Sequence, residues 1–322
     1  MSKKPKVGMW SGLTAVTAVL TAGAIVGTTV AFHYTTTVNN YLDADTYKII
    51  RGDSDEDTEY FKSDFTSDEE RESYEAELCA QVEAEGAALL KNDNNALPLA
   101  SGAKVSLFGH GSVDLMYGGT GSGSVDTSKA PNFKQALEDQ GIQVNSTLWD
   151  LYSSDDMMKN YSRITPAAIS DTLEANTQYA VNEAPWSKLS SAESSFADYG
   201  DAAIVVFSRS GGEGADLPSG ENGTNDSWIK GQEGDGNYLA LSAEEKELLQ
   251  NLKTLKDNGT FKKIIVLINS SNAIEMDFLN PEICGEDYGI DSAMWIGDVG
   301  QTGINGVAQL LAGEVTPSGS PG

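Results

Sequence analysis

The stretch that decides the fold is the apolar run Ala202-Ala203-Ile204-Val205-Val206, which continues as Phe207-Ser208-Arg209-Ser210-Gly211-Gly212-Glu213-Gly214-Ala215-Asp216. A short continuous apolar run is typical of a strand buried on both faces of a parallel sheet. In open α/β sheets, ligands bind beyond the carboxyl ends of such strands. Glu213 follows this strand on a loop whose glycines let a ligand approach. The alternative interpretation is a solvated loop carboxylate in a very acidic chain.

Strand and helix patterns alternate on both sides of this run. Further strands are predicted at 104–108, 142–144, 263–268 and 292–296, and helices at 133–138, around 304–311, and after the capping-box sequences Ser67-x-x-Glu70 and Ser242-Ala243-Glu244-Glu245. We expect the first of these helices to bury an apolar face that includes Tyr74, Leu78, Val82 and Leu89. Alternation of this kind predicts an α/β fold with a largely parallel sheet in an α/β/α sandwich.

Two long connections rich in Gly, Ser and Asp, 109–130 and 208–240, both follow strands and are expected to rim a cleft together. The Gly-rich segment 118–124, in the first of these connections, resembles a phosphate-binding loop in its composition. It lacks the Lys of a P-loop and begins well beyond the strand, which disfavours nucleotide binding. A flexible loop, or one close to a sugar, is the favoured interpretation.

The amino-terminal part divides into three segments ahead of the globular domain. Residues 1–8 are a basic tail expected in the cytoplasm, and residues 9–32 carry no charge and are long enough to span a hydrocarbon core of about 30 Å. Residues 33–66 form an acidic stalk, and 67–320 the globular domain. We therefore expect a single-pass anchor in the cell membrane with the globular domain outside. A cleaved signal peptide and a secreted protein is the alternative, with Ala22-Gly23-Ala24 as the small-residue site.

The composition excludes several functions. With 48 acidic against 21 basic side chains the formal net charge is −27, which argues against nucleic acid because phosphate binding needs basic patches. Only two Cys and two His are present, without metal-ligand spacing, so neither a metal nor another cofactor is predicted. Two buried free thiols are expected rather than a disulfide.

An ordered set of short motifs resembles the α/β-sandwich domain of family 3 glycoside hydrolases, the family of β-glucosidases and β-xylosidases. The set comprises Glu85-Gly86-Ala87-Ala88-Leu89-Leu90-Lys91-Asn92, Ala96-Leu97-Pro98-Leu99, the segment 118–125, Ser208-Arg209 with Gly212-Glu213-Gly214 and Asp216, Val266-Leu267-Ile268-Asn269-Ser270, the segment 295–300, and Pro317-Ser318-Gly319. The matches run in order from about residue 60 to residue 319. No single motif decides the resemblance.

The resemblance implies a hydrolase of O-glycosyl bonds acting on glucosides or oligosaccharides. It makes Glu213 the general acid/base, and places Asp216, Arg209, Gly119, Thr120 and Ser122 near the sugar. The nucleophile of such enzymes is an aspartate on a separate TIM-barrel domain, and retaining hydrolysis needs the two carboxyl groups about 5–5.5 Å apart. A barrel takes roughly 200 residues or more, which the segments before residue 67 cannot hold. We therefore expect this chain to lack the barrel, with the domain order inverted, and to be inactive alone.

Departures from the family pattern keep other interpretations open. Leu217 follows Asp216 where the family usually has Arg, and Ser320-Pro321-Gly322 replaces the usual basic-Leu-Pro continuation. A non-catalytic carbohydrate-binding or scaffolding module is the main alternative. A nucleotide-using α/β enzyme and a truncated gene for an ordinary glycosidase are the others.

Overall fold

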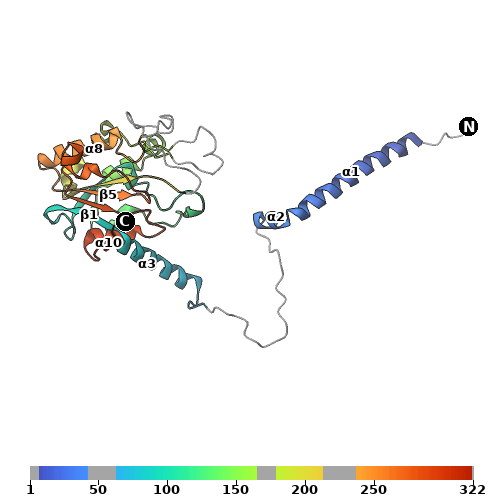
Figure 1. The fold of residues 1–322 in the computed structure, drawn as a ribbon, viewed down its shortest axis with the longest axis horizontal. Helices are drawn as coiled ribbons and strands as arrows, with labels where there is room; N and C mark the ends of the chain where they lie inside the picture. Colours follow the sequence, from blue (N-terminus) through green and yellow to red (C-terminus); the bar gives the residue numbers. More distant parts are fainter. Residues whose placement is uncertain (1–6, 43–62, 165–178, 213–236, 321–322) are drawn as a thin grey trace, which may run out of the picture. The chain divides into compact units, whose positions relative to one another are not determined.

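Strand β4 (Ala202–Ser208) is buried along its whole length and lies inside a six-stranded sheet (Figure 1). It pairs in parallel with β2 (Lys104–Phe108) on one side and with β5 (Ile264–Asn269) on the other. The computed structural model describes residues 7–42, 63–164, 179–212 and 237–320. Contacts divide the chain into two units, Met1–Asp64 and Phe65–Gly322, and the sheet belongs to the second.

The sheet is mixed, with the strand order β1-β6-β5-β4-β2-β3. Strands β6 (Ser292–Trp295) and β3 (Gln143–Val144) extend the parallel pairing at the two sides. Strand β1 (Ala88–Asn92) lies at the edge and runs antiparallel to β6. The predicted α/β class is confirmed, and the predicted strands lie within a residue or two of the observed ones. The edge strand β1 was not predicted, and Leu89, which we expected on a helix, belongs to it.

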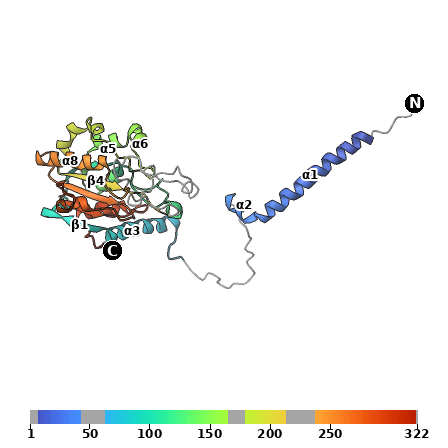
Figure 2. The same ribbon diagram turned by 45° about the horizontal axis from the view of Figure 1, so that its top comes forward.

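Alternate residues of the strands enter two separate cores, so helices cover both faces. Ile204 and Val206 pack with α3 (Asp68–Gly86), α4 (Phe133–Asp139) and α10 (Ile304–Ala312). Val205 and Phe207 pack on the other face, against residues of the helices α5 (Ser146–Tyr152), α6 (Asp155–Asn160) and α8 (Ala243–Asp257). Figure 2 shows α5, α6 and α8 on the side of the sheet opposite to α3.

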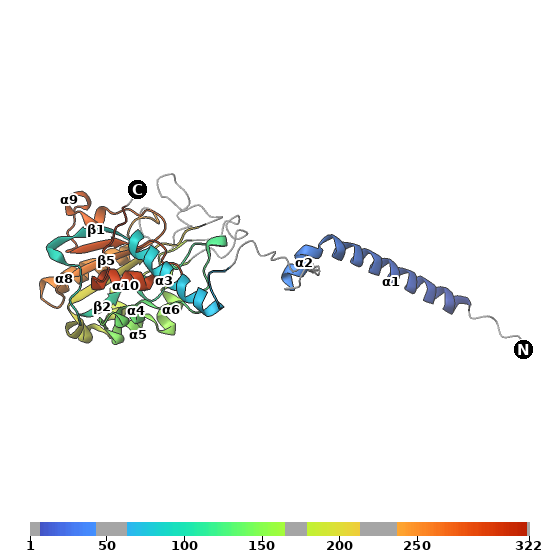
Figure 3. The same cartoon turned by 90° about the horizontal axis from the view of Figure 1, so that it is seen from below.

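Helix α3 begins where the sequence predicts, but it buries a different face. The Ser67 side chain accepts a hydrogen bond from the Glu70 amide and caps the helix. The buried residues are Ala80 and Ala84, which lie against α10 (Figure 3). A Cβ at Gly306 of α10 would come within 2.1 Å of the Ala80 carbonyl oxygen, so small residues are what this close helix pair requires. The expected apolar face of Tyr74, Leu78 and Val82 is exposed instead.

Helix α8 agrees with its sequence signals at both ends. Ser242 and Glu245 form the reciprocal capping box, and Asn258 ends the helix. Leu248, Leu249 and Leu252 are buried on its inner face. The described part of the domain also contains short elements: η1 (Asp93–Asn95), η2 (His110–Ser112), η3 (Gly121–Gly123), η4 (Trp186–Leu189), η5 (Glu193–Tyr199), η8 (Asp277–Leu279) and α9 (Pro281–Cys284).

The unit Met1–Asp64 contains the helices α1 (Val7–His33) and α2 (Thr35–Tyr41). Among the described residues, one helix, Trp10–His33, is long enough and apolar enough to cross a membrane. Signal sequences near an amino terminus have the same property. The two cysteines, Cys79 and Cys284, are free thiols. Both are half-buried, whereas the sequence analysis expected them to be buried.

Candidate functional site

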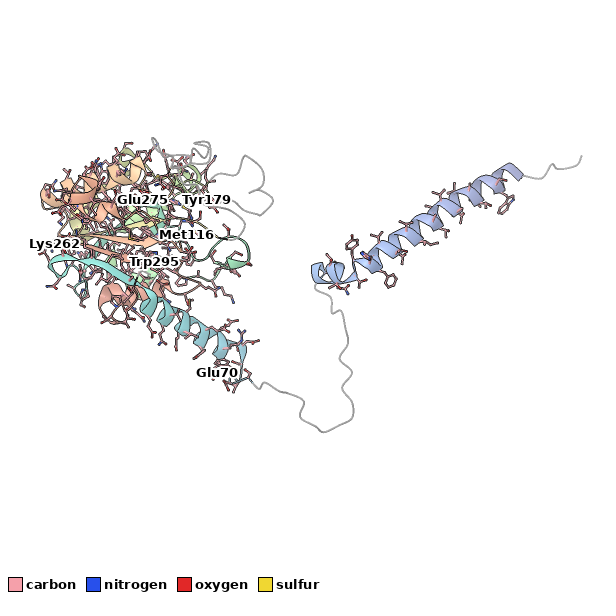
Figure 4. The ribbon with its side chains drawn as sticks, in the orientation of Figure 1. Glu70, Met116, Tyr179, Lys262, Glu275 and Trp295 are labelled. Carbon is pink, nitrogen blue, oxygen red and sulfur yellow. The ribbon has the colours of Figure 1, made fainter. Side chains whose placement is uncertain are left out.

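The candidate site lies at the carboxyl edge of the sheet, where β2, β4, β5 and β6 end. Figure 4 labels residues of both edges: Met116 follows β2 at the carboxyl edge, and Lys262 precedes β5 at the opposite one. In α/β sheets with parallel strands this is the edge at which ligands bind. The connections that leave it carry most of the residues that the sequence analysis selected.

The loop after β4 contacts the Gly-rich loop after β2. The Thr120 amide donates a hydrogen bond to the Gly211 carbonyl oxygen at 3.1 Å, and Thr120 and Gly212 form an isolated parallel β-bridge. Gly212 has φ +148°, and a Cβ there would lie 2.3 Å from the Thr120 nitrogen. The close approach of the two loops therefore depends on a glycine at 212.

The predicted sugar-binding residues of the Gly-rich loop share this contact to different degrees. A Cβ at Gly119 would lie 3.1 Å from the Gly211 carbonyl oxygen, so Gly119 and Thr120 both adjoin the loop after β4. Both are half-buried, and Ser122 is exposed in η3. Glu213 and Asp216 lie outside the described residues. The last described residue before Glu213 is Gly212, which is seated against Thr120.

Arg209 does not lie where we expected it. Its side chain is fully buried, and its guanidinium forms a two-point ion pair with Glu245 at 2.8 and 2.7 Å. It also donates to the carbonyl oxygens of Tyr238 and Ala240, both at 2.7 Å. These acceptors occupy the guanidinium in the described structure, and the part of Arg209 in sugar binding stays a prediction. Arg209 instead fastens the start of the loop that carries Glu213 to the capping box of α8.

An ion pair that the sequence analysis missed lies beneath the Gly-rich loop. Arg163 and Asp114 are paired at 3.1 Å, and Arg163 also donates to the Asp114 and Leu115 carbonyl oxygens and, at 3.2 Å, to the Ser208 hydroxyl. Burial opposes ionisation of Asp114, but the hydrogen bond from His110 and the charge of Arg163 together hold its pKa below the ordinary value. This contact joins the loop after β2 to the end of β4.

The Asp114–Arg163 pair and the Gly-rich loop line one pocket of about 240 Å³. Its walls are formed by residues 114–119, 124, 125, 127 and 163. Backbone amides and carbonyls and the carboxylate of Asp114 are polar groups of the kind that orient a ligand, whereas the guanidinium of Arg163 is engaged by Asp114, Leu115 and Ser208. No group of three His, Cys, Asp or Glu in the described ranges is placed to hold a metal ion.

Asn269, the last residue of β5, has a buried side-chain amide that forms hydrogen bonds to the segments after β2 and β6. Its Oδ1 accepts from the Met116 amide at 2.6 Å, and its Nδ2 donates to the carbonyl oxygens of Met116 and Gly297 at 3.0 and 2.7 Å. The segments after β2 and β6 are thereby held to β5. A polar residue directly after the apolar run 264–268 is a signal that could have identified Asn269. Arg163 has no comparable signal.

A buried carboxyl group supports the turn after β2. Glu183 accepts from the backbone amides of His110 and Ala184 at 2.7 and 3.0 Å. Burial raises the pKa of Glu183 to about 7, although the neighbouring His110 opposes the rise. Gly109 begins this turn with φ +83°, and a Cβ there would come within 2.7 Å of the Val206 carbonyl oxygen. These contacts fix the direction in which the loop leaves β2.

Comparison with known proteins matches this domain to a glycosidase family. Residues 87–321 match the model of the glycosyl hydrolase family 3 C-terminal domain. A β-glucosidase of Ruminococcus albus is 30% identical over 246 residues, covering 76% of this chain and 22% of that protein. β-Glucosidase A of Butyrivibrio fibrisolvens is 30% identical over 260 residues, covering 76% and 28%. The chain thus spans about a quarter of the length of these relatives.

Solved structures show the same fold. A β-glucosidase from Paenibacillus barengoltzii is 27% identical with a TM-score of 0.56, covering 75% of this chain and 23% of that one. β-Glucosidase 3B from Thermotoga neapolitana, solved in complex with α-D-glucose, is 25% identical with a TM-score of 0.55. That match covers 76% of this chain and 30% of the other.

Proposed function

Because the chain belongs to glycosyl hydrolase family 3, through its C-terminal domain, we propose that it is the acid/base-bearing part of a retaining β-glucosidase-type enzyme. Glu213 is the proposed proton donor and acceptor. The nucleophile would be an aspartate of a TIM-barrel domain, on a longer form of this chain or on another chain. The substrates would be β-glucosides or oligosaccharides with O-glycosyl bonds, a class taken from the β-glucosidases to which the chain is similar.

One observation carries the proposal: the loop that leads to Glu213 is held against the Gly-rich loop. The hydrogen bond from Thr120 to Gly211 and the bridge between Thr120 and Gly212 fix the backbone up to the residue before Glu213. Gly212, the residue before Glu213, thus lies against the Gly-rich loop, and residues 118, 119 and 124 of that loop line the 240 Å³ pocket. Asp216, Gly119, Thr120 and Ser122 are proposed to face the sugar from these two loops.

The chemistry needs a second surface to close over Glu213. A general acid must be protonated when it meets the glycosidic oxygen, which for a Glu requires burial or a neighbouring charge to raise the pKa. A carboxylate about 5–5.5 Å away must then attack the anomeric carbon and form the glycosyl-enzyme. Glu213 afterwards removes the proton from the water that releases the sugar. The barrel would supply both the covering surface and the nucleophile.

A chimaera tests the proposal directly. Residues 87–321 of this chain replace the matching segment of the Ruminococcus albus β-glucosidase, and hydrolysis of aryl β-glucosides is followed. We expect turnover by the chimaera and none by the isolated chain. Glu213→Ala should reduce kcat by about a hundredfold to ten-thousandfold, since general acid–base catalysis contributes on the order of 10²–10⁴. Azide should restore turnover of an activated aryl glucoside, because it attacks the glycosyl-enzyme without needing a base.

Glu282→Ala, which removes an exposed carboxylate from α9, is the matched control and should leave kcat unchanged. Thermal unfolding of each chimaera checks that it is folded. A folded chimaera that turns over equally with and without Glu213 would exclude the acid/base role. One that binds glucose without any turnover would favour the carbohydrate-binding alternative.

We further propose that residues 9–32 anchor the chain in the cell membrane with the domain Phe65–Gly322 outside. The apolar helix Trp10–His33 and the lysines ahead of it support this orientation. A secreted form cleaved near Ala22-Gly23-Ala24 is the alternative. Either location would give the domain access to extracellular glucosides.

A further inference from the structure

Helix α3 exposes an apolar stripe on the side opposite to its buried face. Ala80 and Ala84 contact the rest of the domain, whereas Tyr74, Leu78 and Val82 are 52%, 43% and 62% exposed. These three residues recur every four positions, so they lie in one row along the helix. We call Tyr74, Leu78 and Val82 the α3 stripe. Figure 4 shows the end of α3 near Glu70 projecting from the body of the domain. Within the chain, the ring of Phe65 contacts the ring of Tyr74, with the centroids 5.3 Å apart.

The side chains around the α3 stripe are arranged symmetrically about Leu78. Tyr74 precedes it by four residues and Val82 follows it by four, while Arg71 precedes it by seven and Glu85 follows it by seven. Residues seven apart lie on the same face of a helix. The row therefore has a cation at one end, a carboxylate at the other, and apolar residues between them. Such a surface is complementary to itself when a second copy is rotated by 180°.

We propose that the α3 stripe binds a second copy of this chain, with the two α3 helices antiparallel about a two-fold axis at Leu78. Leu78 then packs on Leu78 of the second copy, Tyr74 on Val82, and Arg71 faces Glu85. A two-fold interface requires that each patch match itself, which this order of residues satisfies. The surface acts independently of the proposed glycosidase activity.

Charge and size indicate how tight the pair should be. In the single chain, Arg71 pairs with Glu75 at 2.7 Å, and Gln81 donates a hydrogen bond to Glu85 at 2.7 Å. Because these side chains are exposed, Arg71 and Glu85 can turn toward a second copy instead. The net charge of −27 opposes association of two copies, so added salt should strengthen the dimer by screening it. One helix per copy gives an interface below the roughly 1,200 Å² of stable complexes, so we expect a weak, reversible dimer.

Disulfide cross-linking of the full chain in detergent tests the register. Both native cysteines are first replaced, Cys79→Ser and Cys284→Ser, and single cysteines are then introduced. Leu78→Cys should form a covalent dimer under mild oxidation. Tyr74→Cys and Val82→Cys should cross-link when mixed but not alone, because equivalent positions would lie about 12 Å apart along the axis. Ser73→Cys, exposed on the same helix but off the stripe, is the control and should stay monomeric.

A charge exchange tests the complementarity by sedimentation equilibrium. Arg71→Glu and Glu85→Arg should each weaken dimerisation about tenfold, since each places like charges opposite one another. The double variant R71E/E85R keeps the net charge and should restore the wild-type constant to within about threefold. Circular dichroism confirms that α3 is intact. Equal cross-linking at Ser73→Cys, failure of Leu78→Cys to cross-link, or failure of the double variant to recover would each overturn the proposal.

Discussion

Arg209 shows how a residue near a catalytic loop can serve the fold instead of the ligand. Arg209 lies four residues before Glu213 in the sequence, so a sugar contact was predicted. In the structure it forms an ion pair with Glu245, and the two side chains are 0% and 1% exposed. Burying both charges is tolerable only because each finds a partner. Whether the side chain points into the loop or into the core depends on α8, which lies far along the chain.

Removing one charge of the Arg209–Glu245 pair should be costly. Glu245→Gln leaves the guanidinium buried without its counter-charge and weakens the cap of α8, so the free energy of unfolding should fall by about 3–5 kcal/mol. Lys262→Gln is the matched control, because it breaks an ion pair with Asp201 whose lysine side chain is 72% exposed. That change should cost less than about 1 kcal/mol. Urea unfolding measures both, and equal losses would contradict the structural role of Arg209.

Glu83 on α3 should make stability depend on pH. Burial, and then the nearby charge of Asp298, raise the pKa of Glu83 to about 8 from 4.5, and its Oε1 is buried without a hydrogen-bond partner. The folded state therefore holds a proton that the unfolded state releases between about pH 4.5 and 8. The stabilisation by this proton is complete below pH 4.5 and is lost as the pH rises through 8.

The variant Glu83→Gln removes that dependence. Its free energy of unfolding relative to the wild type should increase between about pH 4.5 and 8, by on the order of a few kcal/mol at most. Glu77→Gln, at an exposed position of the same helix, removes the same charge and serves as the control. Chemical denaturation at several pH values gives the comparison. A constant difference between Glu83→Gln and the wild type across this range would contradict the prediction.

At the scale of elements, local patterns predicted the interior strands better than the edges. β4 and β5 are mostly apolar runs buried along their whole length, and β2 and β6 are buried at all but one position, so their sequences identify them. β1 was missed because its residues Ala88-Leu89-Leu90 also continue the helical pattern of α3. The face of α3 was mispredicted because periodicity favours the larger apolar residues, whereas a close approach to α10 selects alanines.

The candidate site was predictable only in part for a related reason. The glycines of 118–124 and 211–212 mark close backbone approaches that sequence can locate, and the structure brings these two loops together. The contacts that hold them, from Arg163 and Asn269, join segments distant in the chain. No local pattern in one sequence reveals such pairs. The roles of Glu213 and Asp216 stay predictions.

The contact between the two loops gives a prediction about catalysis. In the chimaera, Gly212→Ala would bring a Cβ to 2.3 Å from the Thr120 nitrogen, and it would strain a residue with φ +148°. The loops must separate and carry position 213 with them, so kcat should fall tenfold or more, with a smaller change in KM. Gly123→Ala lies in the same Gly-rich loop with open space around it and should leave kcat within about twofold. Equal effects of the two substitutions would contradict the proposed geometry.

At the scale of the whole molecule, the chain combines a compact domain with an apolar amino-terminal helix. In the described residues of the domain, one hydrophobic core covers each face of its sheet. The mechanism proposed for it nevertheless needs a carboxylate from another domain, since double displacement uses two. Activity is thus expected to depend on an assembly, while stability is expected to depend on the domain alone.

The amino-terminal helix makes the last prediction. Residues Trp10–His33 of this helix are apolar. The helix continues past the small-residue site at Ala22-Gly23-Ala24 through Ile25, Val26 and Phe32. A signal peptide is normally shorter in its apolar region, about 7–15 residues, than the roughly 20 that span a bilayer. The expressed chain should therefore remain in the membrane fraction after alkaline carbonate washing, with residues 1–8 present by mass spectrometry. Release into the medium with a new amino terminus near residue 25 would instead establish a cleaved leader, because the intact mass alone separates the two forms.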